Sequence, residues 1–209
     1  MSSRQVQRVL VDANIFYSRT LRDWLCLLYL HGGSGMFQLY WTEDIMAEVL
    51  YRLRRKHPFL DEQQVGGIRR AIIDTIGDHG QILGYTIDRH RHYPDPLDAH
   101  IHCAALHGEM DIVLTANGKD FTSDDSDDLP YEVYDADAFF ELIDDSNPAL
   151  VRTVTQEQLV YWVGRKGKSL PEALRAADAG QFAERVRRHL QTLDVGQILA
   201  ATDRSPTAT

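Results

Sequence analysis

Cysteine is scarce in this chain, which has only Cys26 and Cys103 among its 209 residues. A disulfide scaffold and a structural zinc site both need more thiols than this. Each cysteine lies in an apolar stretch, so we expect two reduced thiols in the core. Long apolar runs are missing too, because the longest, Trp24 to Leu30, falls far short of the ~20 residues that span a membrane. The polar N-terminus does not resemble an export signal, so the cytoplasm is the expected location.

Positive charge is also in short supply. The sequence has 22 Lys and Arg against 31 Asp and Glu, a net charge of -9, which argues against binding nucleic acid through a basic surface overall. It does not exclude an enzyme that gathers acidic groups around a metal ion and keeps its basic residues local. Basic residues concentrate at 52–56, and an acidic run at 124–128 is interpreted as a solvated loop.

The segments that are present alternate between two patterns. Short apolar, β-rich runs predict strands at 8–12, 37–41, 81–87, 111–115 and 131–134. Helical patterns lie between them and at 136–143, and Thr42 and Asp61 are expected to cap two of these helices. The alternation predicts an α/β fold with three α/β/α layers, in which helices cover both faces of a mostly parallel sheet of four to five strands.

The alternation of strand and helix patterns ends at Asn147-Pro148, and helical patterns follow. Helix-start patterns at Thr155 and Ser169, followed by helical periodicity from Leu174 to Leu190, predict a small helical extension. We therefore expect one domain over residues 1–147, a helical extension over 148–199, and a disordered tail over 200–209.

Polar side chains follow several predicted strands, where they end or one helical turn later. These residues are Asp12, Glu48, Asp98, Asn117 and Asp120. Because the carboxyl ends of parallel strands meet at one edge of a sheet, the fold should bring them together. Carboxylate oxygens suit Mg²⁺, and a metal that activates water and neutralises phosphate charge suits phosphodiester cleavage.

Each residue also has a structural explanation when taken alone. Asp98 fits a helix capped by Asp95, Asn117 with Asp120 fits a second cap, and Glu48 fits a solvated helix face. Asp12 is harder to explain in this way, because a carboxylate that follows a buried strand loses solvation unless it is paired or bound to a metal.

The segments are much more specific as a set. They read LVDAN at 10–14, TEDIMAE at 42–48, DPLDAHI at 95–101 and IVLTANGKDF at 112–121. In this order and spacing the chain resembles the PIN-domain family of metal-dependent ribonucleases, and within it the VapC-like toxins of bacterial type II toxin–antitoxin pairs. The resemblance extends from about Val9 to Ile143.

The resemblance implies a role for each matching residue. It assigns an acidic cluster for Mg²⁺ or Mn²⁺, with Asp12, Asp98 and Asp120 as ligands and Glu48 acting through water or on the nucleophile. Asn14 would orient Asp12 or touch the substrate, and Thr115 would support the cluster. Asn117 stands where the family often has Asp, so one negative charge is missing. Arg52 and Arg55, just past Glu48, are candidates to grip RNA, although basic residues at a helix end also complement its dipole.

The implied activity is metal-dependent endonucleolytic cleavage of single-stranded or loop RNA. The implied partners are an antitoxin that covers the site and a second copy of the chain in a homodimer.

Two other functions fit parts of the pattern. An aspartyl-phosphate enzyme of the haloacid-dehalogenase kind also begins with an acid after the first strand, with Lys119 in a suitable place, but it needs a second acid where Asn14 stands. A PIN-like scaffold that binds RNA or protein without cutting is disfavoured by the intact acidic residues and is favoured only by Asn117. Zinc binding by the histidines is disfavoured, because His100 and His102 lie two residues apart on a predicted helix and face different ways.

Overall fold

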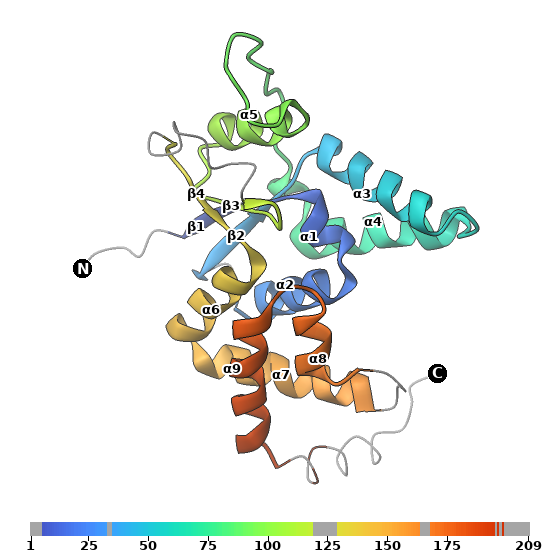
Figure 1. The fold of residues 1–209 in the computed structure, drawn as a ribbon, viewed down its shortest axis with the longest axis vertical. Coiled ribbons are helices and arrows are strands. Elements are labelled where there is room, and N and C mark those ends of the chain that lie inside the picture. Colours follow the sequence, from blue (N-terminus) through green and yellow to red (C-terminus); the bar gives the residue numbers. More distant parts are fainter. Residues whose placement is uncertain are drawn as a thin grey trace. The chain divides into compact units, whose positions relative to one another are not determined.

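The computed structural model describes residues 6–32, 35–118, 129–163, 168–194, 196 and 198. The chain divides into two compact units, Met1–Ala136 and Asp137–Thr209. They are described separately below, with the elements labelled in Figure 1. The domain boundary expected at residue 147 stays a prediction, and the tail expected at 200–209 lies outside the described residues.

The first unit is built on a parallel sheet. Its strands are β1 (Gln7–Val11), β2 (Phe37–Tyr40), β3 (Ile112–Leu114) and β4 (Glu132–Tyr134). They form a four-stranded sheet in the order β2-β1-β3-β4, and every pairing is parallel. β1 is central, and Val9 to Val11 are fully buried, as expected for a strand covered on both faces. The predicted α/β fold with a parallel sheet flanked by helices is confirmed.

The strand predicted at 81–87 is wrong. Only Gln81 pairs with the sheet region, through an isolated bridge to Trp41. Leu83 and Ile87, which suggested alternation, are 67% and 50% exposed. Gly84 between them has φ of +74°, a backbone conformation incompatible with a continuing strand. The apolar pattern here therefore belongs to an exposed connection.

The helices of the first unit begin where local capping signals predict them. They are α1 (Ala13–Tyr17), α2 (Arg19–Gly32), α3 (Glu43–Lys56), α4 (Glu62–Ile76) and α5 (Ala99–His107), with short 3-10 turns η2 (Asp78–Gly80) and η3 (Pro96–Asp98). The Thr42 hydroxyl accepts the Ile45 N–H at the start of α3, and Asp61 with Gln64 forms a capping box at the start of α4. α3 and α4 lie side by side (Figure 1), and α1 packs against α3.

The second unit is helical. Its elements are α6 (Ala136–Ser146), α7 (Pro148–Val163), α8 (Leu170–Arg175) and α9 (Gly180–Thr192). The rings of Phe140 on α6 and Phe182 on α9 lie 5.0 Å apart. The predicted helix start at Ser169 is confirmed, since the Glu172 carboxylate accepts its N–H. The helix start predicted at Thr155 is wrong, because Thr155 lies within α7 and its hydroxyl donates to the Val151 carbonyl.

Candidate active site

Asp12 occupies the position immediately after β1. In the sheet register Val11 pairs with Leu114, so the next residues of the two strands, Asp12 and Thr115, become neighbours. The Asp12 N–H donates to the Leu114 carbonyl at 2.9 Å, which carries the pairing one step past the strand end. The Thr115 hydroxyl donates to Asp12 Oδ2 at 2.7 Å. The parallel register therefore fixes the Asp12 carboxylate against the end of β3.

Asn14, in the first turn of α1, ties these two strand ends together. Its Nδ2 donates to Asp12 Oδ2 at 2.6 Å and to Thr115 Oγ1 at 3.0 Å. Its Oδ1 accepts the Ala116 N–H at 2.9 Å. The hydroxyl of Thr115 also accepts the Asn117 N–H at 3.1 Å. Asp12 is thus held by a network that leaves its side chain little rotational freedom.

The electrostatic surroundings of Asp12 oppose its charge. Only 5% of the residue is exposed, and burial raises the pKa of its carboxyl, with a further increase from the nearby Glu48 charge. The Thr115 hydrogen bond and the Arg52 charge act in the opposite direction. Asp12 and Glu48 are therefore close enough to repel each other, although Asp12 follows β1 and Glu48 lies on α3.

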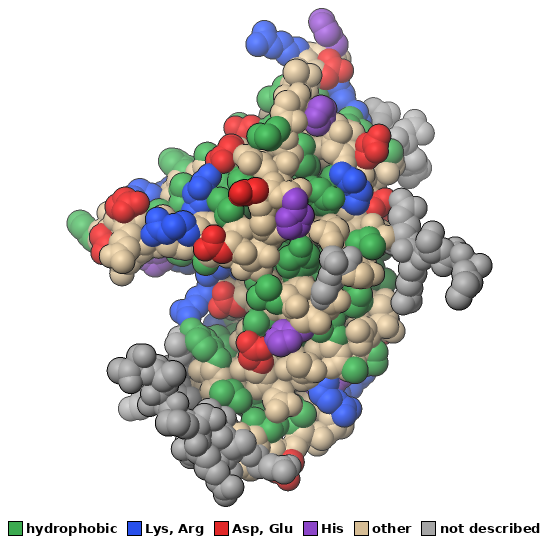
Figure 2. Space-filling view, turned by 180° about the vertical axis from the view of Figure 1, so that it is seen from behind, with side chains coloured by type: hydrophobic (Ala, Val, Ile, Leu, Met, Phe, Trp, Pro, Cys, Tyr) green, Lys and Arg blue, Asp and Glu red, His purple; other side chains and the backbone are tan. Residues whose placement is uncertain are grey.

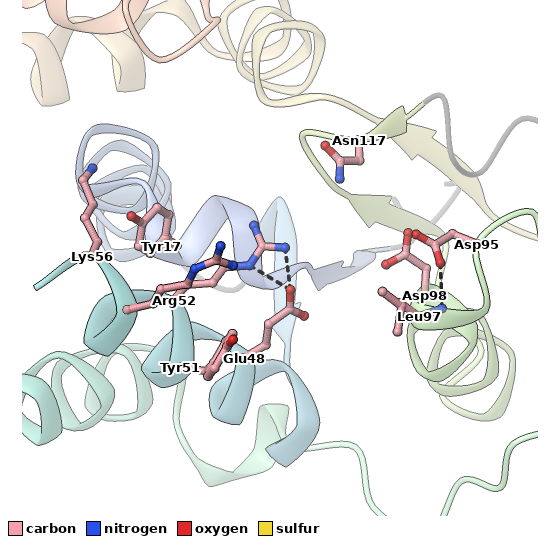
Figure 3. A pocket seen from close by; sticks show the side chains of 10 residues that line it. Tyr17, Glu48, Tyr51, Arg52, Lys56, Asp95, Leu97, Asp98 and Asn117 are labelled. Atoms are coloured by element: carbon pink, nitrogen blue, oxygen red, sulfur yellow. Dashed lines mark hydrogen bonds and ion pairs between the residues drawn. The ribbon is translucent and has the colours of Figure 1, made fainter. Parts of the chain in front are cut away.

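A pocket of about 830 Å³ opens beside this network. The residues that line it are Tyr17, Glu48, Tyr51, Arg52, Arg55, Lys56, Asp95, Leu97, Asp98 and Asn117. In Figure 3, Glu48, Tyr51 and Arg52 on α3 lie across the pocket from the Asp95 and Asp98 side. One wall thus mixes a carboxylate with aromatic and cationic groups, and the opposite wall is acidic.

Glu48 and Arg52 form an ion pair on the α3 wall, drawn with dashed lines in Figure 3. Arg52 Nε and Nη2 both reach Glu48 Oε1, at 2.8 and 2.5 Å. The two residues are four positions apart on the helix with the Glu first, which is the favourable order for an ion pair at this spacing. About a third of the Glu48 side chain is exposed, so the pair remains accessible from the pocket.

The structure brings most of the sequence-predicted residues to one place. Glu48, Asp98, Asn117, Arg52 and Arg55 all line the pocket. Asp98 ends the turn η3 and precedes α5, and the Asp95 side chain caps this turn by accepting the Leu97 N–H at 2.8 Å. Asn14 and Thr115 hold Asp12 in place and do not line the pocket, nor does Asp12. Asp120 lies outside the described residues.

The described residues alone do not complete a metal site. Within them no group of three acidic, histidine or cysteine side chains lies close enough to hold an ion. Mg²⁺, however, keeps several waters and is commonly bound by one or two carboxylates together with substrate phosphates. The oxygen donors of Asp12, Glu48 and Asp98 fit such a cation in chemical type, and the repulsion between Asp12 and Glu48 favours a positive charge nearby.

Sequence reasoning missed Tyr17, Tyr51, Asp95 and Leu97 as pocket residues. Tyr51 was detectable, because it lies three positions after Glu48 and therefore on the same helix face. Tyr17 was not, because the five-residue helix α1 that carries it has no sequence signature of its own. Leu97 is an exposed apolar residue whose position depends on η3.

His102 belongs to the core of the first unit. Its Nδ1 is hydrogen bonded to the Tyr131 hydroxyl, and burial, with a contribution from Arg91, lowers the pKa of its imidazole to about 4. The ring is therefore neutral at pH 7, and its bond to Tyr131 supports the start of β4.

Charge is mixed over the rest of the surface. On the face shown in Figure 2, acidic, basic and apolar side chains are interspersed over the described residues without a continuous basic area. Among the helices described, none combines the length and apolar character needed to cross a membrane.

Comparison with known families decides how this arrangement is classified. A family model described as PIN domain matches residues 8–119, more than half of the chain. This chain belongs to the PIN-domain family. The matched segment contains the sheet end with Asp12, the helix with Glu48 and the turn with Asp98. Searches among curated proteins and among solved structures found no match.

Membership in the PIN family carries a general expectation of function. PIN domains are generally nucleases, that is, hydrolases of phosphodiester bonds, and they typically use divalent metal ions. The aspartyl-phosphate alternative loses its support, because it requires a different family. A PIN scaffold without activity remains the competing hypothesis.

Proposed function

We propose that this PIN domain is an Mg²⁺- or Mn²⁺-dependent endoribonuclease that cuts single-stranded or loop RNA. The observation that carries the proposal is the placement of acidic groups around one pocket. Asp12 is fixed at the strand end within electrostatic reach of Glu48, and Asp98 faces the same 830 Å³ pocket from the opposite wall.

The protein side chains have distinct tasks in this proposal. Asn14 and Thr115 hold the Asp12 carboxylate at a fixed angle, so that it is ready to bind an ion without rearrangement. Glu48 orients the attacking water, and Asp98 contributes a further oxygen from the opposite wall. Asp120, outside the described residues, is proposed to complete the set. A bound Mg²⁺ or Mn²⁺ would lower the pKa of a water and neutralise charge on the phosphate.

Arg52 adds a positive charge to the same end of the pocket. Its guanidinium is held by Glu48 and is therefore preorganised next to the acidic cluster. A fixed cation near the phosphate stabilises negative charge that develops during attack. Cleavage with in-line attack by water leaves 5′-phosphate and 3′-hydroxyl ends.

We further propose that the protein is the toxin of a toxin–antitoxin pair, as VapC-like proteins are. An RNA-cutting toxin acts in the cytoplasm and must be silenced by a partner, so a small antitoxin that covers the pocket is expected, as is a homodimer of the chain. Support comes from the order and spacing of the PIN segments and from the pocket's accessibility at Glu48 and Arg52.

The test is cleavage of a mixed pool of structured and unstructured RNAs by the purified protein. Reactions contain Mg²⁺, Mn²⁺ or EDTA, with wild type beside Asp12→Asn and Asp74→Asn. Asp74 is exposed on α4 and does not line the pocket, so its variant controls for loss of a carboxylate elsewhere. We expect cutting that requires metal, is lost in Asp12→Asn, and persists in Asp74→Asn.

Other outcomes discriminate among the hypotheses. Equal cutting by wild type and Asp12→Asn would mean contamination or a different site. RNA binding without cutting under any metal condition would support the non-catalytic scaffold, which Asn117 in the pocket favours. Expression in a bacterial host tests the toxin role, since wild type should arrest growth and Asp12→Asn should not.

A further inference from the structure

Helix α3 presents a continuous stripe of functional side chains to the pocket. Glu48, Tyr51, Arg52, Arg55 and Lys56 all line it, and their spacing of three and four residues places them on one helix face. The opposite face, with Ile45, Met46, Val49 and Leu53, is buried in the core. At 1.5 Å of rise per residue, the stripe extends about 12 Å from Glu48 to Lys56.

Charge changes sign along this stripe. At its first end Glu48 and Arg52 neutralise each other through their ion pair. At its far end, Arg55 and Lys56 have no acidic partner among the described residues. The opposite pocket wall carries Asp95 and Asp98. The pocket is therefore acidic where the proposed chemistry takes place and cationic about two helical turns away.

An exposed aromatic ring lies between these two ends. Tyr51 is 64% exposed although its ring faces the pocket, so the fold leaves a flat apolar surface open to solvent beside two cations. A second ring, Tyr17 on α1, lies 5.5 Å from the Lys56 ammonium in a cation–π arrangement. Both residues line the pocket, so this contact keeps the Lys56 ammonium at the pocket wall.

We propose that the α3 stripe is a nucleotide subsite, in which Tyr51 stacks on an unpaired RNA base and Arg55 with Lys56 binds the adjacent phosphate. An aromatic ring can stack on any base, and each such contact contributes substantially to single-strand binding. The adjacent cations supply local phosphate contacts on a protein whose net charge is -9. The scissile phosphate then lies at the Glu48 end of the stripe, one nucleotide away from the stacked base.

This inference rests on the proposed function and adds two properties to it. Stacking requires a base that is free of pairing, so Tyr51 makes the pocket selective for single strands. The polarity of the stripe places the stacked base and its phosphate on the Arg55 and Lys56 side of the acidic cluster, because two cations without acidic partners among the described residues lie there.

The experiment measures binding separately from cleavage. Asp12→Asn protein in EDTA is titrated against a fluorescent unstructured RNA oligonucleotide and against a duplex of the same composition, with anisotropy as the readout. Tyr51→Ala, Tyr51→Trp and the double variant Arg55→Ala/Lys56→Ala are made in this background. Phe59→Ala is the aromatic control, since Phe59 is 98% exposed and lies outside the pocket lining. Arg70→Ala, on exposed α4, is the charge control.

The expected pattern is specific to each side chain. Tyr51→Ala should weaken single-strand binding by about 5- to 100-fold with little effect on duplex binding, and Tyr51→Trp should retain it. Arg55→Ala/Lys56→Ala should reduce the slope of log affinity against log salt by about 0.7, as expected when one phosphate of a single strand is no longer neutralised. Phe59→Ala and Arg70→Ala should bind as the parent does. Thermal denaturation verifies that each variant is folded.

The results separate this inference from the proposed function. Metal-dependent cleavage together with unchanged RNA binding by Tyr51→Ala would overturn the subsite and leave the nuclease intact. Tyr51-dependent binding without cleavage by wild type under any metal condition would overturn the nuclease and leave the subsite. If Phe59→Ala weakened binding as much as Tyr51→Ala, the effect would not be local and the subsite would be rejected.

Discussion

Asp12 combines low exposure with a full set of hydrogen bonds, and these two facts act against each other. Burial disfavours the ionised carboxylate, whereas the Thr115 hydroxyl and the Asn14 amide stabilise it. Burial is the larger effect, so the pKa of Asp12 is raised. A buried carboxylate next to a second acid, Glu48, does not stabilise the fold, so its presence indicates a functional site.

The raised pKa of Asp12 predicts how stability depends on pH. In EDTA the folded protein binds the proton more tightly than the unfolded chain, whose Asp pKa is about 3.9. The free-energy cost of ionising Asp12 in the folded protein is therefore absent below the pKa of the unfolded chain and grows as pH rises through the pKa of the folded protein. Its full size is about 1.4 kcal/mol for each pH unit by which these two pKa values differ. Asp12→Asn removes this penalty, so its stability relative to wild type should increase from pH 4 to pH 7.

Urea denaturation of both proteins over this pH range measures the difference directly. Asp74→Asn serves as the control, because its carboxylate is exposed on α4. A difference between wild type and Asp12→Asn that stays constant with pH would contradict the assignment of a buried, charge-disfavoured carboxylate.

At the scale of elements, α3 positions the site more than any other segment. It carries five of the pocket residues on one face, and its opposite face anchors it in the core. Its start is fixed by Thr42, a residue that is 1% exposed and whose hydroxyl accepts the Ile45 N–H at 3.1 Å. The orientation of Glu48 and Tyr51 therefore depends on a buried cap at the carboxyl end of β2.

Removing this cap should destabilise the protein measurably. Thr42→Ala leaves the buried Ile45 N–H without a partner, which costs about 1–3 kcal/mol. Thr42→Ser retains the hydroxyl and should recover most of that loss. Asp61→Ala at the solvent-exposed capping box of α4 should cost less, because water can replace the lost acceptor. Chemical denaturation ranks the three variants, and equal losses for Thr42→Ala and Thr42→Ser would show that the cap is unimportant.

At the scale of the whole molecule, the helical unit is held by a concentrated ionic cluster. Arg185 on α9 contacts Glu141, Asp144 and Asp145, all on α6, and His189 Nε2 lies 2.7 Å from Asp144. Asp144 is buried, and the three carboxylates raise the pKa of Arg185 through their hydrogen bonds. The cluster thus joins the first and last helices of this unit.

Loss of Arg185 should loosen the second unit without affecting the sheet. Arg185→Ala leaves the buried Asp144 with one partner fewer, next to two further acids, and should cost about 1–3 kcal/mol. Hydrogen exchange should show faster exchange in α6 and α9 and unchanged protection in β1 and β3. Arg187→Ala is the matched control, because Arg187 also lies on α9 but forms its ion pair with Glu184 of the same helix, whereas Arg185 contacts α6. Faster exchange spread equally over both units would contradict a local role.

The sequence by itself determined the parts of this protein that depend on neighbouring residues along the chain. The capped starts of α3, α4 and α8 follow from side chains three positions away, and the buried strands β1 and β3 follow from unbroken apolar runs. The alternation of these elements then gave the parallel sheet, and with it the shared edge at which Asp12 and Thr115 meet.

Only the tertiary structure decided features that depend on distant residues. Segment 81–87 has an apolar pattern but is not a strand, because strand formation needs a partner edge and only Gln81 reaches one. Thr155 has the pattern of a helix start but lies inside α7, where the preceding turn already supplies its hydrogen bonds. Tyr17 and Leu97 became pocket residues because α1 packs against α3 and η3 lies on the opposite side of the pocket. Sequence patterns record local preferences, whereas a pocket forms from surfaces that meet only after the chain has folded.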